Sequence, residues 1–433
     1  MKIKRLNIIK LYNQFSYDIN FLEDNQLLSI LTGPNGYGKT TVLQIIDNIS
    51  KGNFLYFYTI PFESIEFYFT ENISLKIYVE ENKKDTDSDE EITIKKIKFI
   101  YEDKNQNIIN SLELDLEDIY KLISPAYRRS ANVYSIQDLT IPRLIQFIES
   151  NPELRIYDDI AKSQNQEQFL FFVAGFKSFF IPAQRLYFIN DQEEKRYYRT
   201  IQYEKKTSID EVVFSIQQQL QNAKFNYLKN AQDHDNLFIN KYLSSTKEAY
   251  TEEEYETESE KLQLLIDELF SYRLINKIEL LKFDINHKKI LTVYLDDLKE
   301  KLEYYVLLLR KLRVFSSVLT EKKFTNKTVS FSPEHGILVK LSDGSNIDVN
   351  SLSSGEKNEI IMLYHLIFDV KDNTVLLIDE PEISLHVAWQ LEFLNDVEKI
   401  IEDKKLQVII ATHSPQIINE KWDLCFDFYE HRK

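Results

Sequence analysis

The chain has 433 residues, long enough for two or three structural units, and its 53 basic and 69 acidic side chains give a formal net charge of −16. This charge excludes tight non-specific binding to nucleic acid or an anionic membrane through overall charge, although it leaves a local basic groove open. The single cysteine, Cys425, excludes an internal disulfide and a cysteine-based zinc cluster, and suits a reducing cytosol.

The sequence shows no export signal or membrane span. The basic start, MKIKRLNIIK, is too briefly apolar for a signal peptide. The longest apolar run, Phe169 to Pro182, is interrupted by Lys177 and is too short to cross a bilayer. We therefore expect this run to be a buried core element, and the protein to be cytoplasmic without a membrane partner.

The first predicted elements form a strand–loop–helix unit. Strands are expected at 2–11 and 28–32, and the second runs directly into the glycine-rich segment GPNGYGKT (33–40). Helical spacing of apolar residues follows over 40–49. This is the context that a P-loop requires, in which backbone amides cradle phosphates and the lysine reaches the β- and γ-phosphates. The sequence thus predicts binding of a nucleoside triphosphate.

Strand patterns continue to about residue 102. Alternating stretches at 64–69, 74–80 and 92–101 predict strands, and the acidic run Glu80–Glu91 between the last two predicts a solvated hairpin tip. Residues 103–186 are mixed in character.

From 187 to 327 the chain has no glycine or proline and is expected to be helical. Apolar residues at alternating steps of three and four predict a short heptad seam: Leu295, Leu298, Leu302, Tyr305, Leu309 and Leu312. A second stripe contains Leu262, Leu265, Ile266, Leu269 and Phe270. This region is either a helical subdomain that packs on itself or a short antiparallel arm that presents a partner surface, and neither excludes the other.

Strand signals return at 328–332, 337–341 and 346–349, and the segment LSSGE (352–356) then opens a predicted helix. A serine and a glycine amide at a helix start form an anion site. The spacing of Ser353 and Glu356 also fits a capping box, so both interpretations stay open from these residues alone.

A buried strand is predicted at 374–378, followed by a helix to about Glu402 and a second buried strand at 406–411. Strands that alternate with helices imply a parallel sheet covered on both faces. The first strand ends in Asp379 and Glu380, at the sheet edge where such folds bind ligands. Asp379 could hold Mg²⁺, directly or through water, and Glu380 could polarise the attacking water, while a capping role for both acids competes.

The order of these segments resembles the ABC-class ATPases, and the phrase DEPEISLHVAWQ (379–390) is similar to the branch that contains SMC, RecF and the OLD-like ATPases. That branch includes ATPase subunits of bacterial anti-phage systems such as Septu and retrons. The signature departs from the family pattern because Ser354 stands where its first glycine would be. The resemblance implies an α/β ABC-type ATPase head, with a mixed or parallel sheet, flanking helices and an antiparallel β lobe, interrupted by a helical insertion. Its parts would be an N-terminal lobe (1–186), the insertion (187–327) and a C-terminal lobe (328–433).

The resemblance also implies roles for single residues, with ATP and Mg²⁺ as the bound species. Phosphate contacts would come from Asn35, Gly36, Gly38 and Lys39, with Thr40 on Mg²⁺ and Thr41 on the α-phosphate. Ser353 and Gly355 would reach the γ-phosphate of ATP held by the other protomer of a homodimer. His413 would contact the γ-phosphate, and 384–386 would form a loop that communicates between the two sites. Gln184, with Arg185 as a weaker companion, is the candidate for the glutamine that senses metal and water.

Three functions compete. The favoured one is a dimeric ATPase that controls a separately encoded effector, expected to be a nuclease, with nucleic acid contacted indirectly. The second is a self-sufficient OLD-type ATPase–nuclease, which is disfavoured because the chain ends soon after His413 and leaves no room for a nuclease domain. The third is the nucleotide-binding subunit of a transporter, which is disfavoured by the long stretch between the P-loop and LSSGE.

Overall fold

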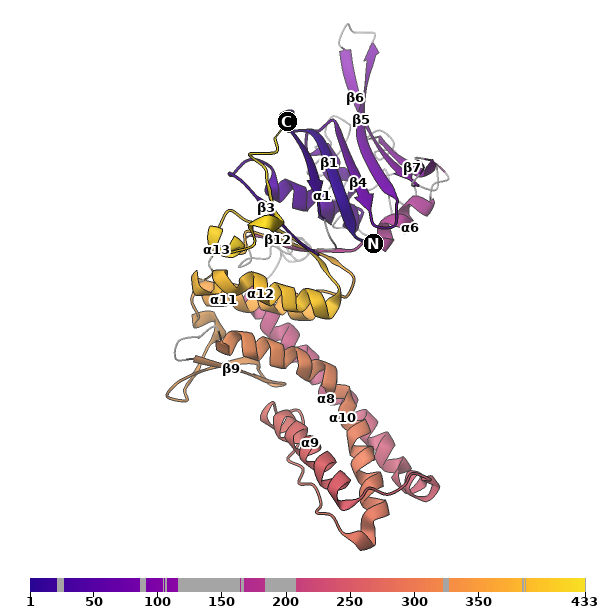
Figure 1. The fold of residues 1–433 in the computed structure, drawn as a ribbon, viewed down its shortest axis with the longest axis vertical. Coiled ribbons are helices and arrows are strands. Elements are labelled where there is room, and N and C mark those ends of the chain that lie inside the picture. Colours follow the sequence, from indigo (N-terminus) through magenta and orange to yellow (C-terminus); the bar gives the residue numbers. More distant parts are fainter. Residues whose placement is uncertain are drawn as a thin grey trace, which may run out of the picture. The chain divides into compact units, whose positions relative to one another are not determined.

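The computed structural model describes residues 1–21, 27–85, 91–103, 105, 107–115, 164, 167–183, 208–321, 327–383, 385 and 387–432 (Figure 1). The chain divides into two compact units. The first comprises residues 1–184, 189–202 and 370–433, and the second comprises 185–188 and 203–369. Residues 328–369, which the sequence places with a C-terminal lobe, therefore lie in the second unit. The three-part division of the chain stays a prediction.

The first unit contains an antiparallel sheet of order β2-β1-β4-β5-β6-β7. Its strands alternate buried and exposed side chains, as expected of a sheet with one face on the core. The strands are β1 (Ile3–Leu11), β2 (Phe15–Asn20), β4 (Ser64–Phe69), β5 (Ser74–Asp85), β6 (Glu91–Glu102) and β7 (Ile108–Asp115). The acidic run is not all hairpin tip, because β5 and β6 stay paired as far as Asp85 and Glu91.

The same unit contains a wholly parallel sheet of order β14-β3-β13-β12-β8. The two strands β13 and β12 have every residue buried, and their only charged residue is Asp379 at the carboxyl end of β12. The strands are β3 (Leu28–Thr32), β8 (Ser178–Ile181), β12 (Val375–Asp379), β13 (Gln407–Ala411) and β14 (Cys425–Asp427). Asp379 pairs with Ala411, Ala411 with Leu31 and Asp427 with Thr32, so the carboxyl ends lie side by side at one edge.

Helix α1 (Lys39–Lys51) packs against β8, β12 and β13 of this sheet. Its apolar residues recur at helical spacing and are all buried: Val42, Leu43, Ile45, Ile46 and Ile49. They belong to one hydrophobic core that also includes residues of both sheets. The unit is completed by η1 (Phe54–Tyr58), α6 (Glu167–Gly175), α12 (Val387–Lys404), α13 (Pro415–Ile418) and η7 (Trp422–Leu424). The apolar run at 169–182 thus supplies α6 and β8, and its expected burial in the core is confirmed at Phe169, Phe172, Val173, Phe176 and Ile181.

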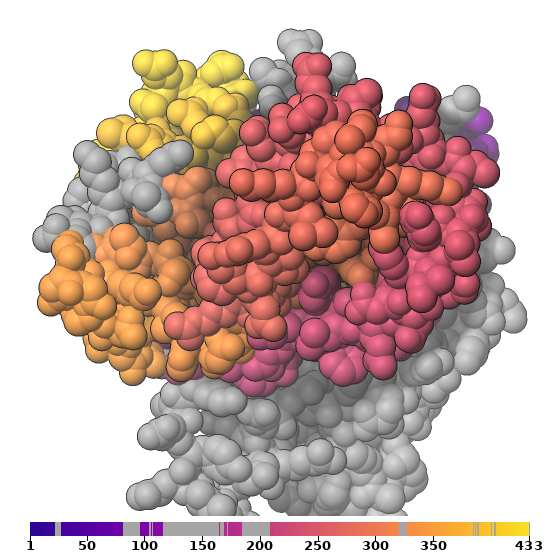
Figure 2. Space-filling view, turned by 90° about the horizontal axis from the view of Figure 1, so that it is seen from below, coloured from indigo at the N-terminus to yellow at the C-terminus, as the bar shows by residue number. Residues whose placement is uncertain are grey.

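The second unit is built on two long helices, α8 (Ser208–Ser244) and α10 (Lys288–Glu321). Tyr227 contacts Tyr305, and His234 contacts Asp297, so the helices run antiparallel. The predicted heptad seam is confirmed, since all six of its residues are buried. Helix α9 (Glu252–Ser271) packs on α10 and buries Leu262, Ile266 and Leu269, whereas Phe270 of the second predicted stripe is exposed. A short turn, η4 (Ile285–His287), leads into α10. Figure 2, seen from below the view of Figure 1, shows the residues of α8, α9 and α10 together in red to orange-red.

The helical pair continues into a small sheet and a further helix of the same unit. The sheet has the order β11-β10-β9, from β9 (Lys327–Ser332), β10 (Gly336–Leu341) and β11 (Asn346–Ile347). Gly336 has a φ of +68°, and a Cβ there would meet the Val213 carbonyl oxygen at 2.2 Å, so glycine lets α8 approach β10. The turn η5 (Val349–Ser351) leads to α11 (Ser354–Tyr364) and a π-helical turn, η6 (His365–Asp369).

The α/β fold class is confirmed, with a parallel sheet, an antiparallel sheet and a helical region. Among the described residues, no helix is both long enough and apolar enough to cross a membrane.

Candidate nucleotide-binding site

The P-loop lies between β3 and α1, at the carboxyl edge of the parallel sheet. Gly33, Gly36 and Gly38 all have positive φ, as the glycine pattern predicts. Two of them are also tightly enclosed. A Cβ on Gly33 would approach the Phe428 Cβ to 3.1 Å, and one on Gly38 would approach the Leu11 Cδ2 to 2.9 Å. Glycine here therefore sets the path of the loop, and Gly38 forms the amino-terminal end of α1.

Lys39 is a buried cation within this loop. Its side-chain nitrogen donates to the carbonyl oxygens of Gly33 at 2.7 Å and Pro34 at 3.1 Å. Burial lowers the pKa of Lys39, and the nearby carboxylates of Glu380, Asp379 and Glu382 act in the opposite direction. The Lys39 ammonium is thus held by the loop carbonyls, near the carboxylates at the end of β12 and just after it.

Thr40 and Asp379, which are far apart in the sequence, meet in space. The Thr40 hydroxyl lies 3.1 Å and 3.0 Å from the two carboxylate oxygens of Asp379, which is buried. A hydroxyl and a carboxylate are hard oxygen ligands of the type that Mg²⁺ takes at phosphate sites. The residues present therefore fit the Mg²⁺ that the P-loop pattern implies.

Glu380 follows Asp379 in an unusual backbone conformation, with a φ of +41°. Its amide donates to the Ala411 carbonyl oxygen at 2.8 Å, which continues the β12–β13 ladder by one bond. Non-glycine residues with positive φ cost free energy and cluster at functional sites. This turn brings the Glu380 carboxylate to 3.7 Å from Nδ1 of His413, so the structure places both predicted catalytic side chains together.

Glu382 is a site residue to which the sequence analysis gave no role. Its Oε1 accepts from the Thr412 hydroxyl at 2.7 Å and from the His413 amide at 3.0 Å. The same oxygen lies 3.2 Å from Nδ1 of His413. The sequence pattern gives roles only to the first two acids of the DEPE run, Asp379 and Glu380. The proximity of the third acid depends on the register between β12 and β13.

Aromatic side chains and the end of the chain surround the P-loop. The Tyr12 hydroxyl lies 2.8 Å from the Thr41 hydroxyl, and Tyr17 donates to the Tyr37 carbonyl oxygen. Arg432 lies over the Tyr429 ring and donates to the Tyr37 hydroxyl. The contacts of Tyr429 and Arg432 could not be read from the sequence, because they depend on the three-residue strand β14 pairing with β3.

The predicted signature residues begin α11 in the second unit. Ser353 is the N-cap, its hydroxyl accepts from the Glu356 amide, and the Glu356 carboxylate accepts from the Ser353 amide at 2.9 Å. Lys327 pairs with the same carboxylate, and together these contacts lower the pKa of Glu356 against the opposing effect of its burial. The capping-box interpretation is thus confirmed. The predicted phosphate contact of Ser353 and Gly355 stays a prediction.

The remaining predicted residues are partly outside the described chain. Gln184, Arg185, Ser384 and His386 lie there, so their roles stay predictions. Asn35 and Gly36 are exposed at the tip of the P-loop, where a ligand can reach them.

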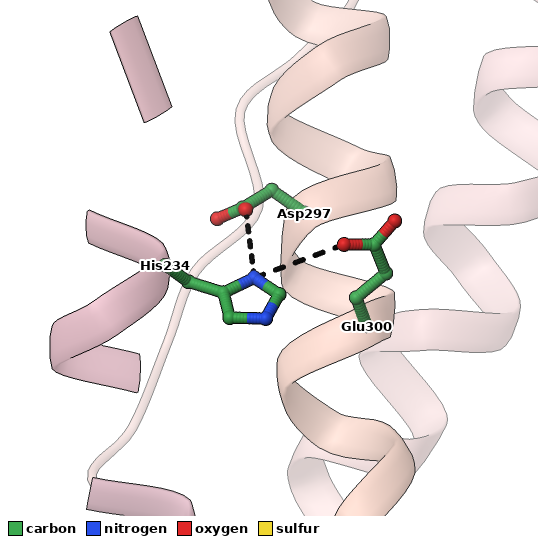
Figure 3. A group of neighbouring side chains, drawn as sticks. All are labelled: His234, Asp297 and Glu300. Carbon is green, nitrogen blue, oxygen red and sulfur yellow. Dashed lines mark hydrogen bonds and ion pairs between the residues drawn. The ribbon is translucent and has the colours of Figure 1, made fainter. Parts of the chain in front are cut away.

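A second polar cluster lies between α8 and α10 and contains His234, Asp297 and Glu300 (Figure 3). One ligand atom from each lies within 4.8 Å of the others, which would suit a metal ion. However, the Lys241 ammonium lies 3.0 Å from His234 Nδ1, 2.8 Å from Asp297 and 2.7 Å from Glu300. It occupies the position that a cation would take. Because Lys301 also pairs with Asp297, we interpret the cluster as an ion network that fixes the register of the two helices.

The sequence is similar to that of known ATPases. A family model described as "AAA ATPase domain" matches residues 1–418. The chain is 27% identical over 147 residues to the DNA double-strand break repair Rad50 ATPase of Sulfurisphaera tokodaii, which covers 30% of this chain and 16% of that protein. It is 33% identical over 66 residues to the thiamine import ATP-binding protein ThiQ of Haemophilus influenzae, which covers 15% of this chain and 29% of that protein. The matched segments thus span less than a third of either relative.

Solved structures were compared as well. An Smc head domain from Pyrococcus furiosus, bound to the C-terminal domain of ScpA, aligns over 96% of this chain and 90% of that chain at 13% identity, with a TM-score of 0.34. The SMC head domain of Thermotoga maritima aligns over 99% of this chain and 94% of that chain at 12% identity, with a TM-score of 0.31. The family match supports a P-loop ATPase domain, and the Rad50 ATPase is similar to part of this chain.

Proposed function

The chain belongs to the AAA ATPase domain family, and on that premise we propose that it is a dimeric, ATP-hydrolysing enzyme that regulates a separate effector, expected to be a nuclease, in anti-phage defence or DNA maintenance. The observation that carries the ATPase part is the contact between Thr40 and Asp379. It joins the end of the P-loop to the acidic end of β12 in one site.

In this proposal, separate residues of the chain bind the phosphates, hold Mg²⁺ and activate the attacking water. The P-loop amides and Lys39 bind the phosphates, and Lys39 exchanges its bonds to the Gly33 and Pro34 carbonyls for phosphate oxygens. Thr40 and Asp379 would hold Mg²⁺, which supplies charge compensation for the phosphates when bound. Glu380 polarises the attacking water as a general base.

The dimer is supported by the chemistry of the α11 start. The signature helix α11 belongs to a different compact unit from the P-loop. Its amino-terminal end carries the Ser353 hydroxyl and several amides, which suit an anion. We propose that this end completes the site of a second copy, with two ATP molecules held between the protomers.

Control of an effector is supported by the way the insertion meets α11. Gln219 of α8 donates to the Tyr364 hydroxyl at the end of α11, and Asn350, just before it, donates to Asp210 of α8. Phe315 of α10 packs on Phe368. A partner that displaces α8 and α10 would therefore act on the helix that bears the signature.

Helix α8 also carries an apolar stripe that suits such a partner. The stripe consists of exposed residues on the side of the helix opposite its buried residues, by the 100° turn per residue: Phe214, Phe225, Leu228, Ile239 and Leu243. The effector would bind along this stripe, which we call the α8 stripe.

An affinity purification from the native host tests the effector part of the proposal. We expect the wild-type chain to retain a nuclease, identified by mass spectrometry and by activity, and Phe225→Ser/Leu228→Ser to reduce its recovery about tenfold because apolar contact area is lost. The control Asn222→Ser/Asn226→Ser alters exposed residues of the same helix away from the stripe. Equal recovery with both variants would contradict docking on the α8 stripe.

The same preparation separates the competing functions. The net charge of −16 disfavours autonomous tight DNA binding, so the purified chain should leave DNA intact. Robust cleavage by the chain alone with Mg²⁺ or Mn²⁺ would instead favour a self-sufficient nuclease, and recovery of a membrane permease would favour a transporter subunit.

A further inference from the structure

The loop after β13 is held to the segment after β12 by polar contacts from both sides. On one side, Glu382 accepts from the Thr412 hydroxyl and the His413 amide. On the other, Gln390 of α12 donates to the carbonyl oxygens of Glu382 and Leu385 and accepts from the Ser414 hydroxyl. The parallel pairing of Asp379 with Ala411 makes this possible, because it sets the two strand ends at the same level.

Glu382 is the buried member of this arrangement. Its side chain is only 8% exposed, whereas the His413 side chain is 50% exposed. Among the residues that the structure describes, its Oε2 has no hydrogen-bond partner, although it is buried. Burial of a carboxylate with an unsatisfied oxygen is costly, and such groups call for an explanation beyond packing.

The Glu382 carboxylate also bears on which ring nitrogen of His413 carries the proton. An ionised carboxylate only accepts hydrogen bonds, so a hydrogen bond across this 3.2 Å contact requires the proton to be on the nitrogen that faces Glu382. That nitrogen is Nδ1 of His413. The other ring nitrogen, Nε2, then lies on the side of the ring away from Glu382, and half of the ring is open to solvent.

We propose that Glu382 is a positioning residue for ATP hydrolysis, which fixes the 412–414 loop and the Nδ1 side of the His413 ring so that Nε2 is presented to the bound phosphates. The proposal rests on the proposed ATPase function. A carboxylate that orients a functional histidine in this way is a common device in enzyme sites, and its loss typically costs about 10- to 100-fold in activity.

Substitution by glutamine separates the effect of the carboxylate charge on His413 from the support that the side chain gives to the loop. The amide oxygen of Glu382→Gln can still accept from the Thr412 hydroxyl and the His413 amide, so the loop stays held. The same oxygen faces Nδ1 of His413, so it stays an acceptor there, but without the negative charge it is a weaker acceptor than the carboxylate. Glu382→Ala removes both effects. If the residue only supported the fold, the glutamine variant would behave like the wild type.

Two measurements test the proposal on the full chain. The first compares kcat, KM for ATP and thermal stability for the wild type, Glu382→Gln, His413→Ala and the double variant. We expect Glu382→Gln to lower kcat about tenfold or more, with KM and thermal stability close to wild type, and the double variant to be no slower than His413→Ala alone. The exposed carboxylate variant Glu420→Gln is the matched control and should leave kcat unchanged.

The second measurement does not depend on activity. In ¹⁵N-histidine-labelled protein without nucleotide, in alkaline buffer, the His413 signals report which ring nitrogen carries the proton, and a His413→Gln variant assigns them. We expect the Nδ1–H form in the wild type and a shift towards the Nε2–H form in Glu382→Gln. A glutamine variant with wild-type kcat and wild-type His413 signals would overturn the proposal. If the wild-type chain releases no phosphate but Glu382→Gln still changes the His413 signals, the contact between Glu382 and His413 is supported and the proposed ATPase function is removed.

Discussion

Substitution of Glu380 by glutamine is expected to lower the rate of ATP hydrolysis by about 10²- to 10⁴-fold, the usual contribution of a general base. Glutamine keeps the size of the side chain but cannot take a proton from the attacking water. Because Lys39, Thr40 and Asp379 are unchanged, ATP should still bind, and the ATP-bound state should accumulate. Single-turnover phosphate release, together with nucleotide retained after gel filtration, measures both effects.

The matched control is Asp423→Asn, which removes an exposed carboxylate of the same unit. It should hydrolyse ATP at the wild-type rate. Hydrolysis at the wild-type rate by Glu380→Gln would remove Glu380 from the mechanism. The residue also has positive φ, which glutamine tolerates no better and no worse than glutamate, so the substitution adds no new backbone strain.

Substitution of Lys39 by alanine should weaken nucleotide binding by roughly 10- to 150-fold, since a hydrogen bond to a charged group contributes about 1.5–3 kcal/mol. The phosphates lose their main compensating cation, while the loop carbonyls of Gly33 and Pro34 lose their donor. Equilibrium binding of ATP measured by calorimetry checks the effect.

Lys371→Ala provides the comparison, because Lys371 is an exposed lysine of the same unit. It should bind ATP as the wild type does. An unchanged ATP affinity in Lys39→Ala, with the variant folded, would mean that the P-loop lysine is not a phosphate ligand in this protein.

Much of the fold could be predicted because its patterns are local. The uncharged runs of β12 and β13 indicated buried parallel strands, and the glycine spacing indicated the loop before α1. Alternating side chains indicated β4 and β6. The heptad seam on α10 is buried along its length for the same reason, since one helical face meets one partner.

The rest depends on contacts between distant segments. Strand β14 has only three residues, and nothing in its composition predicts that it pairs with β3 and brings Asp427 and Arg432 to the P-loop. The role of Glu382 depends on the register of β12 against β13. The length of the β5–β6 hairpin was underestimated because its charged residues resemble a loop in sequence.

The candidate site could also be predicted only in part. The meeting of Thr40 with Asp379, and of Glu380 with His413, follows from the rule that parallel strands present their carboxyl ends at one edge. The proposed completion of the site by Ser353 cannot be read from one chain, because it would require a second copy.

A mixing experiment tests the central claim, a composite ATP site, most directly. Lys39→Ala and Ser353→Ala are prepared separately, each with little ATPase activity, and the loss of the α11 cap in the second should cost about 1 kcal/mol of stability. In a heterodimer of the two, one site combines an intact Lys39 with an intact Ser353. An equal mixture should therefore recover about a quarter of the wild-type rate of phosphate release, if protomers associate at random in a symmetric dimer. A mixture no more active than the two variants measured apart, or a wild type that is fully active as a monomer, would contradict the account.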